Sequence, residues 1–354
     1  MTVPDRLRVL VVDDSAVNRR SISEALSKSS DVEVVGKAAD GEEALRLALL
    51  LRPDVITLDL EMPRMDGFTF LRILMSRQPT PVVVVSSYSQ KENVFKALEL
   101  GALDFVAKPE KGASSELASI RTELINKVLS VRSLRPSTLS ARPRLESFSK
   151  LTVMPAPRVR ELTAPKRVIG IASSTGGPTA LIEVFSKLPD DYPNALLVAQ
   201  HMPEKFTKTF AQRLDKRSRL AVSEAEDGDV VGAGFGFICP GRRCMEVEPE
   251  GTDRLRARVL APLESDRYVP SADRLFRSLA RVFKERAIGV ILTGMGDDGV
   301  LGARDIIDAG GTVVAESEET AVIYGMPGSA VRAGVVTRSL PIGKIADYIA
   351  GLSE

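Results

Sequence analysis

The feature that most constrains the fold of this chain is the repeated alternation of short apolar runs with amphipathic segments. In the first 130 residues, five valine-, isoleucine- and leucine-rich runs are each followed by a segment whose apolar residues recur three or four positions apart. Continuous apolar runs are typical of parallel strands buried on both faces, and the segments between them have the period of helices. We therefore predict a doubly wound, five-stranded parallel α/β sheet with strands at 8–14, 32–38, 54–60, 81–87 and 103–109.

The alternation returns from residue 166, after a stretch of different composition. Residues 131–165 are rich in proline, serine and arginine, carry 7 Lys+Arg against 2 Asp+Glu, and show no sustained period. A chain of 354 residues is also longer than one core usually supports. We predict a first domain over 1–130, a basic, semi-stiff linker over 131–165, and a second α/β domain with a mainly parallel sheet over 166–354. The pattern is less regular over 220–261, where we expect hairpins.

Composition argues against several classes of protein. Two cysteines and one histidine are too few for a disulfide scaffold or a Cys/His zinc site. No apolar segment reaches the roughly 18 to 20 residues that span a bilayer, and the N-terminus lacks a signal-peptide core, so we expect a cytoplasmic protein with no direct membrane insertion. Both predicted domains are near neutral, with 17 Lys+Arg against 19 Asp+Glu in the first and 24 against 26 in the second. We therefore expect no nucleic-acid partner.

Acidic residues follow the predicted strands of the first domain. Asp13 and Asp14 end the first strand and Asp59 lies in the third, while Ser86 ends the fourth strand and Lys108 follows the fifth. Carboxyl ends of parallel strands meet at one edge of a sheet, and three carboxylates there suit Mg²⁺. With the metal bound, one carboxylate can attack phosphate, and the hydroxyl and lysine can bind the phosphoryl oxygens. The alternative is that each aspartate only caps a helix.

The segments VVDDS, LDLEMPRMDG, VSS and KP resemble the receiver domain of two-component response regulators over about 120 residues. The resemblance implies that Asp13, Asp14 and Asp59 bind Mg²⁺ and that Asp59 accepts a phosphoryl group from a histidine kinase. It assigns the hydroxyl, aromatic and lysine switch positions to Ser86, Phe105 and Lys108, respectively.

Residues 169–183, IGIASSTGGPTALIE, join an apolar run to an amphipathic segment through a turn of hydroxyl residues and glycines. Such a turn can bind phosphate, cap a helix or present a nucleophile. The phosphate motifs do not fit, because Ala172 and Thr175 occupy glycine positions of a dinucleotide loop and a proline follows the glycine pair where a P-loop has lysine. The order small-x-Ser-x-Gly is close to a nucleophile elbow, and helix capping is the alternative.

A serine nucleophile needs a base and a carboxylate. The single histidine, His201, follows the apolar run 194–200, and the candidate carboxylate, Asp297 or Asp298, follows the apolar run 288–292. Serine, histidine and aspartate at three strand ends of one sheet are what acyl transfer requires, since the imidazole takes the hydroxyl proton and the carboxylate balances the imidazolium. From these residues alone, a helix-capping serine and a structural histidine remain open as alternatives.

The motifs IASSTGGP, AQHMP and ILTGMGDDG resemble those of the CheB family of chemotaxis protein-glutamate methylesterases, and so do FTKTFAQRL, EAEDGD, VPSADRLFRSLA and YGMPGSA. The resemblance implies a triad of Ser174, His201 and Asp298, with Thr175 and the Met295 backbone N–H stabilising the oxyanion. Several positions depart from the family pattern. Ala172 and Ser173 stand where glycine and alanine often precede the serine, so Ser173 is the alternative nucleophile. Asp297 stands where asparagine is common, and Cys244 replaces a histidine in CPGRRCM.

The same resemblance implies that the protein demethylates glutamyl γ-esters on methylated chemoreceptor cytoplasmic domains, releases methanol, and deamidates some receptor glutamines. It also implies that the unphosphorylated receiver covers the esterase site and that the esterase site needs no cofactor. The alternatives are a non-enzymatic receiver adaptor or DNA-binding regulator, and a general hydrolase of small esters.

Overall fold

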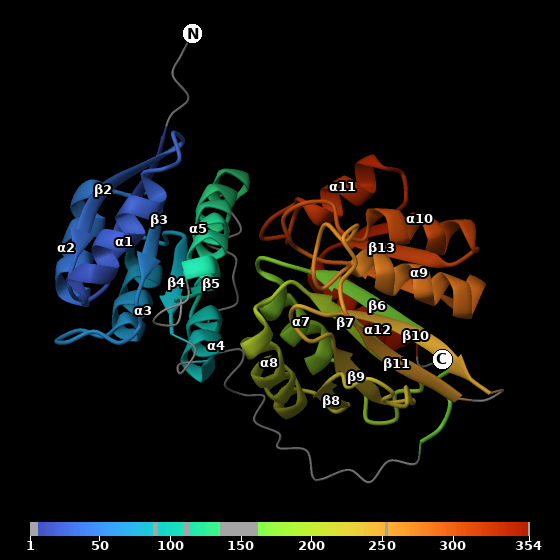
Figure 1. Ribbon diagram of the computed structural model, residues 1–354. Coiled ribbons are helices and arrows are strands. Elements are labelled where there is room, and N and C mark those ends of the chain that lie inside the picture. Colours follow the sequence, from blue (N-terminus) through green and yellow to red (C-terminus); the bar gives the residue numbers. More distant parts are fainter. Residues whose placement is uncertain (1–5, 88–90, 109–113, 135–161, 252–253, 353–354) are drawn as a thin grey trace. The chain divides into compact units, whose positions relative to one another are not determined.

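A computed structural model describes residues 6–87, 91–108, 114–134, 162–251 and 254–352 of the chain (Figure 1). The backbone separates into two compact units, one over Met1–Phe148 and the other over Ser149–Glu354. Each unit is described by itself below. Most of the predicted linker lies outside the described residues, so its boundaries remain a prediction. The first three of its residues complete a 3₁₀ helix, Ser130–Ser133, in which the Val131 side chain is buried.

The first unit contains the predicted five-stranded parallel sheet, with the strand order β2-β1-β3-β4-β5. Helix α1 contacts α5, and α2 contacts α3, as expected for helices that cover the two faces of a doubly wound sheet. The predicted fold class is therefore confirmed for this unit. Its elements are β1 Leu7–Val12, α1 Ala16–Leu26, β2 Val32–Ala38, α2 Gly41–Leu51, β3 Val55–Leu58, α3 Gly67–Arg77, β4 Val82–Ser86, α4 Lys91–Glu99, β5 Asp104–Ala107 and α5 Ser114–Leu129.

Helix starts in the first unit follow from local hydrogen bonding. Ser15, Asp40 and Asp66 are extended residues whose side chains accept from backbone N–H groups of the first turns of α1, α2 and α3. An oxygen at this position satisfies N–H groups that have no partner within the helix. The capping residues are therefore not Asp13, Asp14 or Asp59, which leaves those three carboxylates at the strand ends.

The second unit is built on a seven-stranded sheet with the order β14-β13-β12-β6-β7-β9-β8, in which every described pair is parallel. A separate antiparallel hairpin pairs β10 with β11. The elements are β6 Val168–Ser173, α7 Gly177–Ser186, β7 Ala195–Gln200, α8 Glu204–Arg217, β8 Ala221–Glu224, β9 Phe235–Ile238, β10 Cys244–Glu250, β11 Arg254–Leu260, α9 Ala272–Phe283, a 3₁₀ turn Lys284–Arg286, β12 Ile288–Ile291, α10 Val300–Asp308, β13 Thr312–Glu316, α11 Met326–Arg332, β14 Arg338–Leu340 and α12 Ile342–Gly351.

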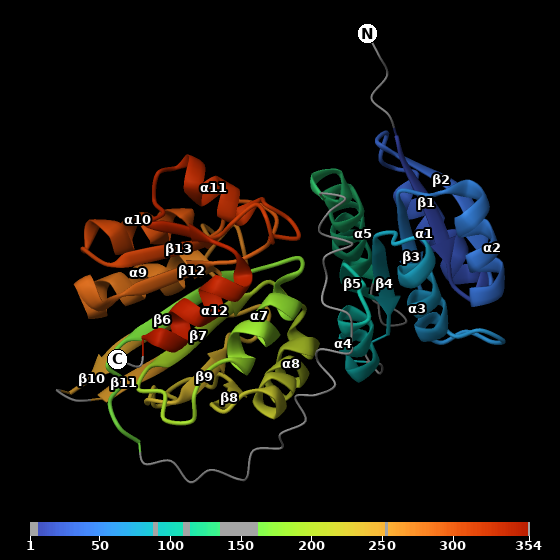
Figure 2. The same cartoon turned by 180° about the vertical axis from the view of Figure 1, so that it is seen from behind.

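Helices cover both faces of this sheet. Helices α7, α8 and α12 lie on one face, and α9, α10 and the β10–β11 hairpin lie on the other (Figures 1 and 2). The central strands β6 and β7 are buried along their whole length, which explains why their sequences are apolar up to their last residues, Ser173 and Gln200. Among its described residues, the irregular stretch forms one hairpin, β10–β11, because β8 and β9 join the edge of the main sheet as parallel strands.

The order of the strands determines where the candidate residues meet. Strand β6 pairs with β7 on one side and β12 on the other, with Ser173 opposite Gln200 and Ala172 opposite Ile291. The residues that follow these three strands therefore emerge together at the carboxyl edge of the sheet, where parallel α/β proteins place their ligands. Ser174, His201 and the 292–299 loop all lie at this edge.

Candidate active site

Two adjacent serines follow β6, and their surroundings differ. Ser173 is fully buried, and its hydroxyl donates to Gln200 Oε1 at 2.6 Å. Ser174 is partly exposed, and its backbone N–H donates to the Thr293 carbonyl at 3.0 Å. Helix α7 has Gly176 as its N-cap and no side-chain capping bond, so Ser174 does not cap this helix. Only Ser174 of the pair combines exposure with a position at the carboxyl edge of the sheet.

Gln200, which sequence reasoning missed, fixes the backbone around both candidate residues. Its amide nitrogen donates to the carbonyl of Ser174 at 3.0 Å and to that of His201 at 2.9 Å. Its side-chain oxygen accepts the hydroxyl hydrogen of Ser173, so each polar atom of this 1 % exposed residue is used. A fully bonded buried amide of this kind holds its neighbours in one arrangement. The serine turn and the histidine are thus tied together by one side chain.

His201 and Asp298 form the hydrogen-bonded pair that the sequence predicts. The imidazole Nε2 lies 2.8 Å from Asp298 Oδ2, with the His201 side chain 17 % exposed and that of Asp298 1 % exposed. Because an ionised carboxylate only accepts hydrogen bonds, Nε2 carries the proton in this pair. Nδ1 is then the ring atom left to take a proton from a nucleophile.

The first turn of α9 holds the carboxylate of Asp298 in place. The backbone N–H of Ala272 donates to Oδ2 at 2.8 Å, and that of Asp273 donates to Oδ1 at 3.1 Å. These are N–H groups that a helix leaves without internal partners, and the helix dipole favours a negative charge at this end. The burial of Asp298 is therefore compensated by backbone donors as well as by the histidine.

On its other side, the His201 ring faces Tyr268, a second residue that the sequence analysis missed. The two rings are stacked, with centroids 5.3 Å apart and planes 6° apart. Tyr268 donates its hydroxyl hydrogen to Asp297 Oδ1 at 2.9 Å, and Arg267 lies 3.3 Å from Asp297 Oδ2. The unusual carboxylate of Asp297 is thus engaged by these two side chains.

The loop after β12 passes directly against the serine. A Cβ placed on Gly294 would lie 2.7 Å from Ser174 Cβ and 2.4 Å from Met326 Sδ, so no larger residue fits there. Thr293 extends the contact, since its hydroxyl donates to the Thr175 carbonyl at 2.9 Å. The loop that carries Met295 therefore lies beside the turn that carries Ser174 and the buried Thr175, as the predicted oxyanion site requires.

A buried carboxylate accepts a hydrogen bond from the backbone of this loop. Glu316, at the end of β13, is 1 % exposed and accepts from the Thr293 backbone N–H at 2.8 Å and the Thr320 hydroxyl at 3.0 Å. Burial raises the pKa of Glu316 to about 7, and the two hydrogen bonds oppose that rise only in part. Glu316 is therefore a titrating group two hydrogen bonds away from the Ser174 backbone.

The predicted acidic cluster is present in the first unit. Carboxylate oxygens of Asp13, Asp14 and Asp59 all lie within 4.8 Å of one another, with Asp13 and Asp59 buried and Asp14 exposed. Burial raises the pKa of Asp59, and the hydrogen bond from Lys108 at 2.5 Å opposes this effect only in part. Lys108 Nζ also lies 2.9 Å from Asp13 Oδ2, so the lysine pairs with two of the three carboxylates. A cluster of three carboxylates supplies the oxygen ligands that a hard cation such as Mg²⁺ prefers.

The three predicted switch residues lie on β4, on β5 and directly after β5. Ser86 is buried at the end of β4, and its carbonyl accepts from the Lys108 backbone N–H at 2.7 Å. Phe105 is buried and packs edge-on against Phe95, with centroids 6.2 Å apart. Lys127, on α5, donates to the Phe105 carbonyl at 2.5 Å and lies 5.1 Å from the centre of its ring. The aromatic position is thus packed inward between two helices.

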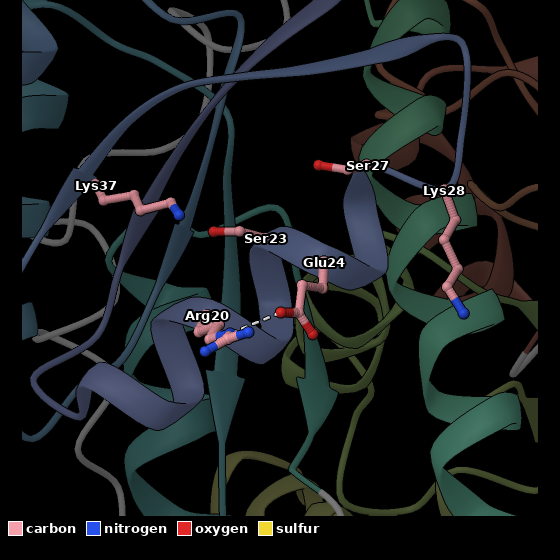
Figure 3. A pocket seen from close by; sticks show the side chains of 6 residues that line it. All are labelled: Arg20, Ser23, Glu24, Ser27, Lys28 and Lys37. Atoms are coloured by element: carbon pink, nitrogen blue, oxygen red, sulfur yellow. Dashed lines mark hydrogen bonds and ion pairs between the residues drawn. The ribbon is translucent and has the colours of Figure 1, made fainter.

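A cavity of about 700 Å³ lies on the surface of the first unit (Figure 3). The residues that line it belong to α1, to the turn after α1 and to β2. Arg20 and Glu24, one turn apart on α1, form an exposed ion pair at 2.7 Å. The lining residues are Arg20, Ser23, Glu24, Ser27, Lys28 and Lys37. None of them belongs to the acidic cluster.

In the part of the chain that the structure describes, no helix is both long and apolar enough to cross a membrane.

Comparisons with known proteins agree with both halves of this description. The family model of the response regulator receiver domain matches residues 9–118, and that of CheB methylesterase matches residues 169–349. The protein-glutamate methylesterase/protein-glutamine glutaminase 3 of Geobacter sulfurreducens is 47% identical over 359 residues, which covers 97% of this chain and 96% of the relative. The protein-glutamate methylesterase/protein-glutamine glutaminase 6 of Anaeromyxobacter dehalogenans is 52% identical over 333 residues, which covers 93% of this chain and 91% of the relative.

A solved structure supports the assignment of the second unit. The crystal structure of the Thermotoga maritima CheB methylesterase catalytic domain is similar with a TM-score of 0.51 and 39% identity. The similarity covers 52% of this chain and 98% of the solved chain. Ser174, His201 and Asp298 all lie within residues 169–349, the range that matches the family model of CheB methylesterase.

Proposed function

The chain belongs to the CheB methylesterase family, and on that premise we propose that it hydrolyses glutamate γ-methyl esters on methylated chemoreceptor cytoplasmic domains. The proposal includes deamidation of receptor glutamines, because the curated relatives are named for both activities. The observation that carries it is the partly exposed Ser174 at the same sheet edge as the hydrogen-bonded His201–Asp298 pair. No observation favours a DNA-binding or purely adaptor role.

In the proposed reaction, Nδ1 of His201 takes the hydroxyl proton of Ser174 as its oxygen attacks the ester carbonyl. The tetrahedral oxyanion is stabilised by the Met295 N–H and by Thr175. The imidazolium, balanced by Asp298, returns the proton to the methoxide, methanol leaves and an acyl-enzyme remains. Water, activated by the same imidazole, then releases the glutamate carboxylate and regenerates the serine. For a glutamine substrate, ammonia leaves in place of methanol.

We further propose that phosphorylation of Asp59 by a histidine kinase increases the esterase rate. Asp13, Asp14 and Asp59 would hold Mg²⁺, which supplies charge neutralisation for the incoming phosphoryl group. Lys108, within 2.5 Å of Asp59, would then bind a phosphoryl oxygen, and Ser86 would donate a hydrogen bond to another. Support comes from the match of residues 9–118 to the receiver family and from the acidic cluster within it.

The test is methanol release from a methylated chemoreceptor cytoplasmic domain by the full chain, with and without Mg²⁺ and acetyl phosphate. We expect Ser174→Ala to abolish release and Ser173→Ala, its matched neighbour, to retain it. We expect acetyl phosphate to increase release by the wild type and to leave Asp59→Asn unchanged. Release that persists in Ser174→Ala would refute the nucleophile, and equal stimulation of Asp59→Asn would refute the phosphorylation site.

A further inference from the structure

Tyr268 makes three separate contacts at the candidate site, although it belongs to none of the motifs that predict the triad. It lies in the loop between β11 and α9. Two of its contacts are the ring stack on His201, with planes 6° apart, and the hydrogen bond from its hydroxyl to Asp297 at 2.9 Å. These contacts place one face of the imidazole against an aromatic ring.

The third contact is with the loop that carries Met295. A Cβ on Gly296 would lie 2.4 Å from the hydroxyl oxygen of Tyr268, and the φ of this glycine is +88°. The left-handed backbone and the close approach both require glycine at this position. Tyr268 therefore touches the proposed base on one side and the proposed oxyanion loop on the other.

We propose that Tyr268 is a positioning residue for the acyl transfer, with its ring fixing the plane of the His201 imidazole so that Nδ1 points at Ser174. This inference rests on the proposed function. The hydrogen bond to Asp298 fixes one ring atom but leaves the ring free to turn about that bond. A parallel aromatic ring removes this freedom, because an offset stack has a preferred mutual plane.

The charges around the imidazole are arranged consistently with this role. Asp298 faces Nε2, while Asp297 is held by the Tyr268 hydroxyl and by Arg267 Nη1 at 3.3 Å. Asp273, next to Ala272 on α9, turns its carboxylate to the Gly302 backbone N–H at 2.8 Å. The Tyr268 hydroxyl thus holds Asp297, and the ring itself acts on His201. Tyr268→Phe retains the stack, whereas Tyr268→Leu removes it.

The experiment uses the full chain with Mg²⁺ and acetyl phosphate, and compares the wild type with Tyr268→Phe and Tyr268→Leu. Tyr348, on α12, lies beside Arg338, and Tyr348→Leu is the matched control. His201 is the only histidine, so its ring signals in NMR spectra are assigned without mutation. We expect the Leu variant alone to lose the aromatic ring-current shift of those signals. We expect its kcat for methanol release to fall by about 10- to 100-fold with KM nearly unchanged.

A serine-directed fluorophosphonate provides a second readout that does not depend on the receptor substrate. Its labelling rate should fall in parallel with kcat in the Leu variant and recover in the Phe variant. Wild-type protein that labels normally but releases no methanol would contradict the proposed function and leave the labelling comparison to decide the role of Tyr268. Tyr268→Met replaces the Leu variant if thermal unfolding shows that the latter is not folded.

Three results would overturn the inference. Unchanged kcat and labelling rate in Tyr268→Leu would show that the stack does not position the base. A higher KM with the same kcat would make Tyr268 part of a substrate-binding wall. An equal loss in Tyr268→Phe would move the effect from the ring to the hydroxyl and Asp297.

Discussion

Replacing Asp298 by asparagine tests whether the buried carboxylate supports catalysis by its charge. Its Oδ2 accepts from both His201 and Ala272, and its Oδ1 accepts from Asp273. In asparagine, an NH₂ group replaces one of the two carboxylate oxygens. In either orientation of the amide, this NH₂ group would face a hydrogen-bond donor where the carboxylate oxygen accepts. The substitution therefore removes the negative charge and disturbs the hydrogen bond that sets the protonated atom of His201.

The size of the effect follows from the distance between the charges. In the transition state the imidazolium charge lies about 4 Å from the carboxylate, which at an effective dielectric constant of about 20 corresponds to about 4 kcal/mol. At about 1.4 kcal/mol for each factor of ten, kcat should fall on the order of 1000-fold. Stability should also fall by about 1–3 kcal/mol, because a backbone donor of α9 is left without a partner.

Asp297→Asn is the control, since it makes the same chemical change one residue away at a side chain that is 46% exposed. Its kcat should stay within a few-fold of the wild type. Both variants are assayed for methanol release by the full chain with Mg²⁺ and acetyl phosphate, and urea unfolding measures their stability. If Asp298→Asn kept more than a tenth of the wild-type kcat, or if Asp297→Asn lost as much, the electrostatic argument would be wrong.

Three further outcomes follow from buried groups. Gly294→Ala should abolish methanol release and destabilise the second unit, because its Cβ would lie 2.7 Å from Ser174 Cβ; urea unfolding and the esterase assay check this. Burial raises the pKa of Glu316 to about 7, whereas the carboxyl of the unfolded chain loses its proton near pH 4.5. Between these pH values the folded state binds one more proton than the unfolded state, so the free energy of unfolding should fall by about 3 kcal/mol as pH rises from 4.5 past 7. Glu316→Gln should remove this part of the dependence, and an unchanged slope in unfolding measurements would contradict it. Lys127→Met should destabilise the first unit by about 3–5 kcal/mol, since Asp104 and Glu123 then lose a shared buried cation; equal urea midpoints would refute this.

Much of the fold could be predicted from the sequence because strands buried on both faces are mostly apolar. Strands β1, β3, β4 and β5, and β6, β7 and β12 in the second unit, all coincide with predicted runs. The irregular region was harder to interpret, because β8, AVSE, mixes apolar and polar residues and β9, FGFI, is apolar over four residues only. Nothing local to them distinguishes a parallel edge strand from one arm of a hairpin.

The candidate residues at strand ends could be predicted for a related reason. Parallel strands bring their carboxyl ends to one edge, so the sequence position of Ser174, His201 and Asp298 already implies their meeting. Ser173 and Ser174 could not be separated by residue type alone, since the difference lies in the hydrogen bond from Ser173 to Gln200. Tyr268 was missed because its contacts reach across segments that are distant in sequence, and no period or spacing marks them.

The support of Asp298 shows why such contacts decide the geometry of the site. Ser271 caps α9, and the backbone N–H groups of the next two residues donate to the Asp298 carboxylate. The position of the first turn of α9 therefore determines the position of this carboxylate. Arg274, in the same turn, is paired with Glu246 of the β10–β11 hairpin at 2.6 Å and with Asp266 at 3.0 Å. The side chain of Arg274 is only 10% exposed, so these pairs are shielded from water and resist displacement. The hairpin contributes none of the candidate catalytic residues, yet by fixing α9 it fixes the carboxylate that orients His201.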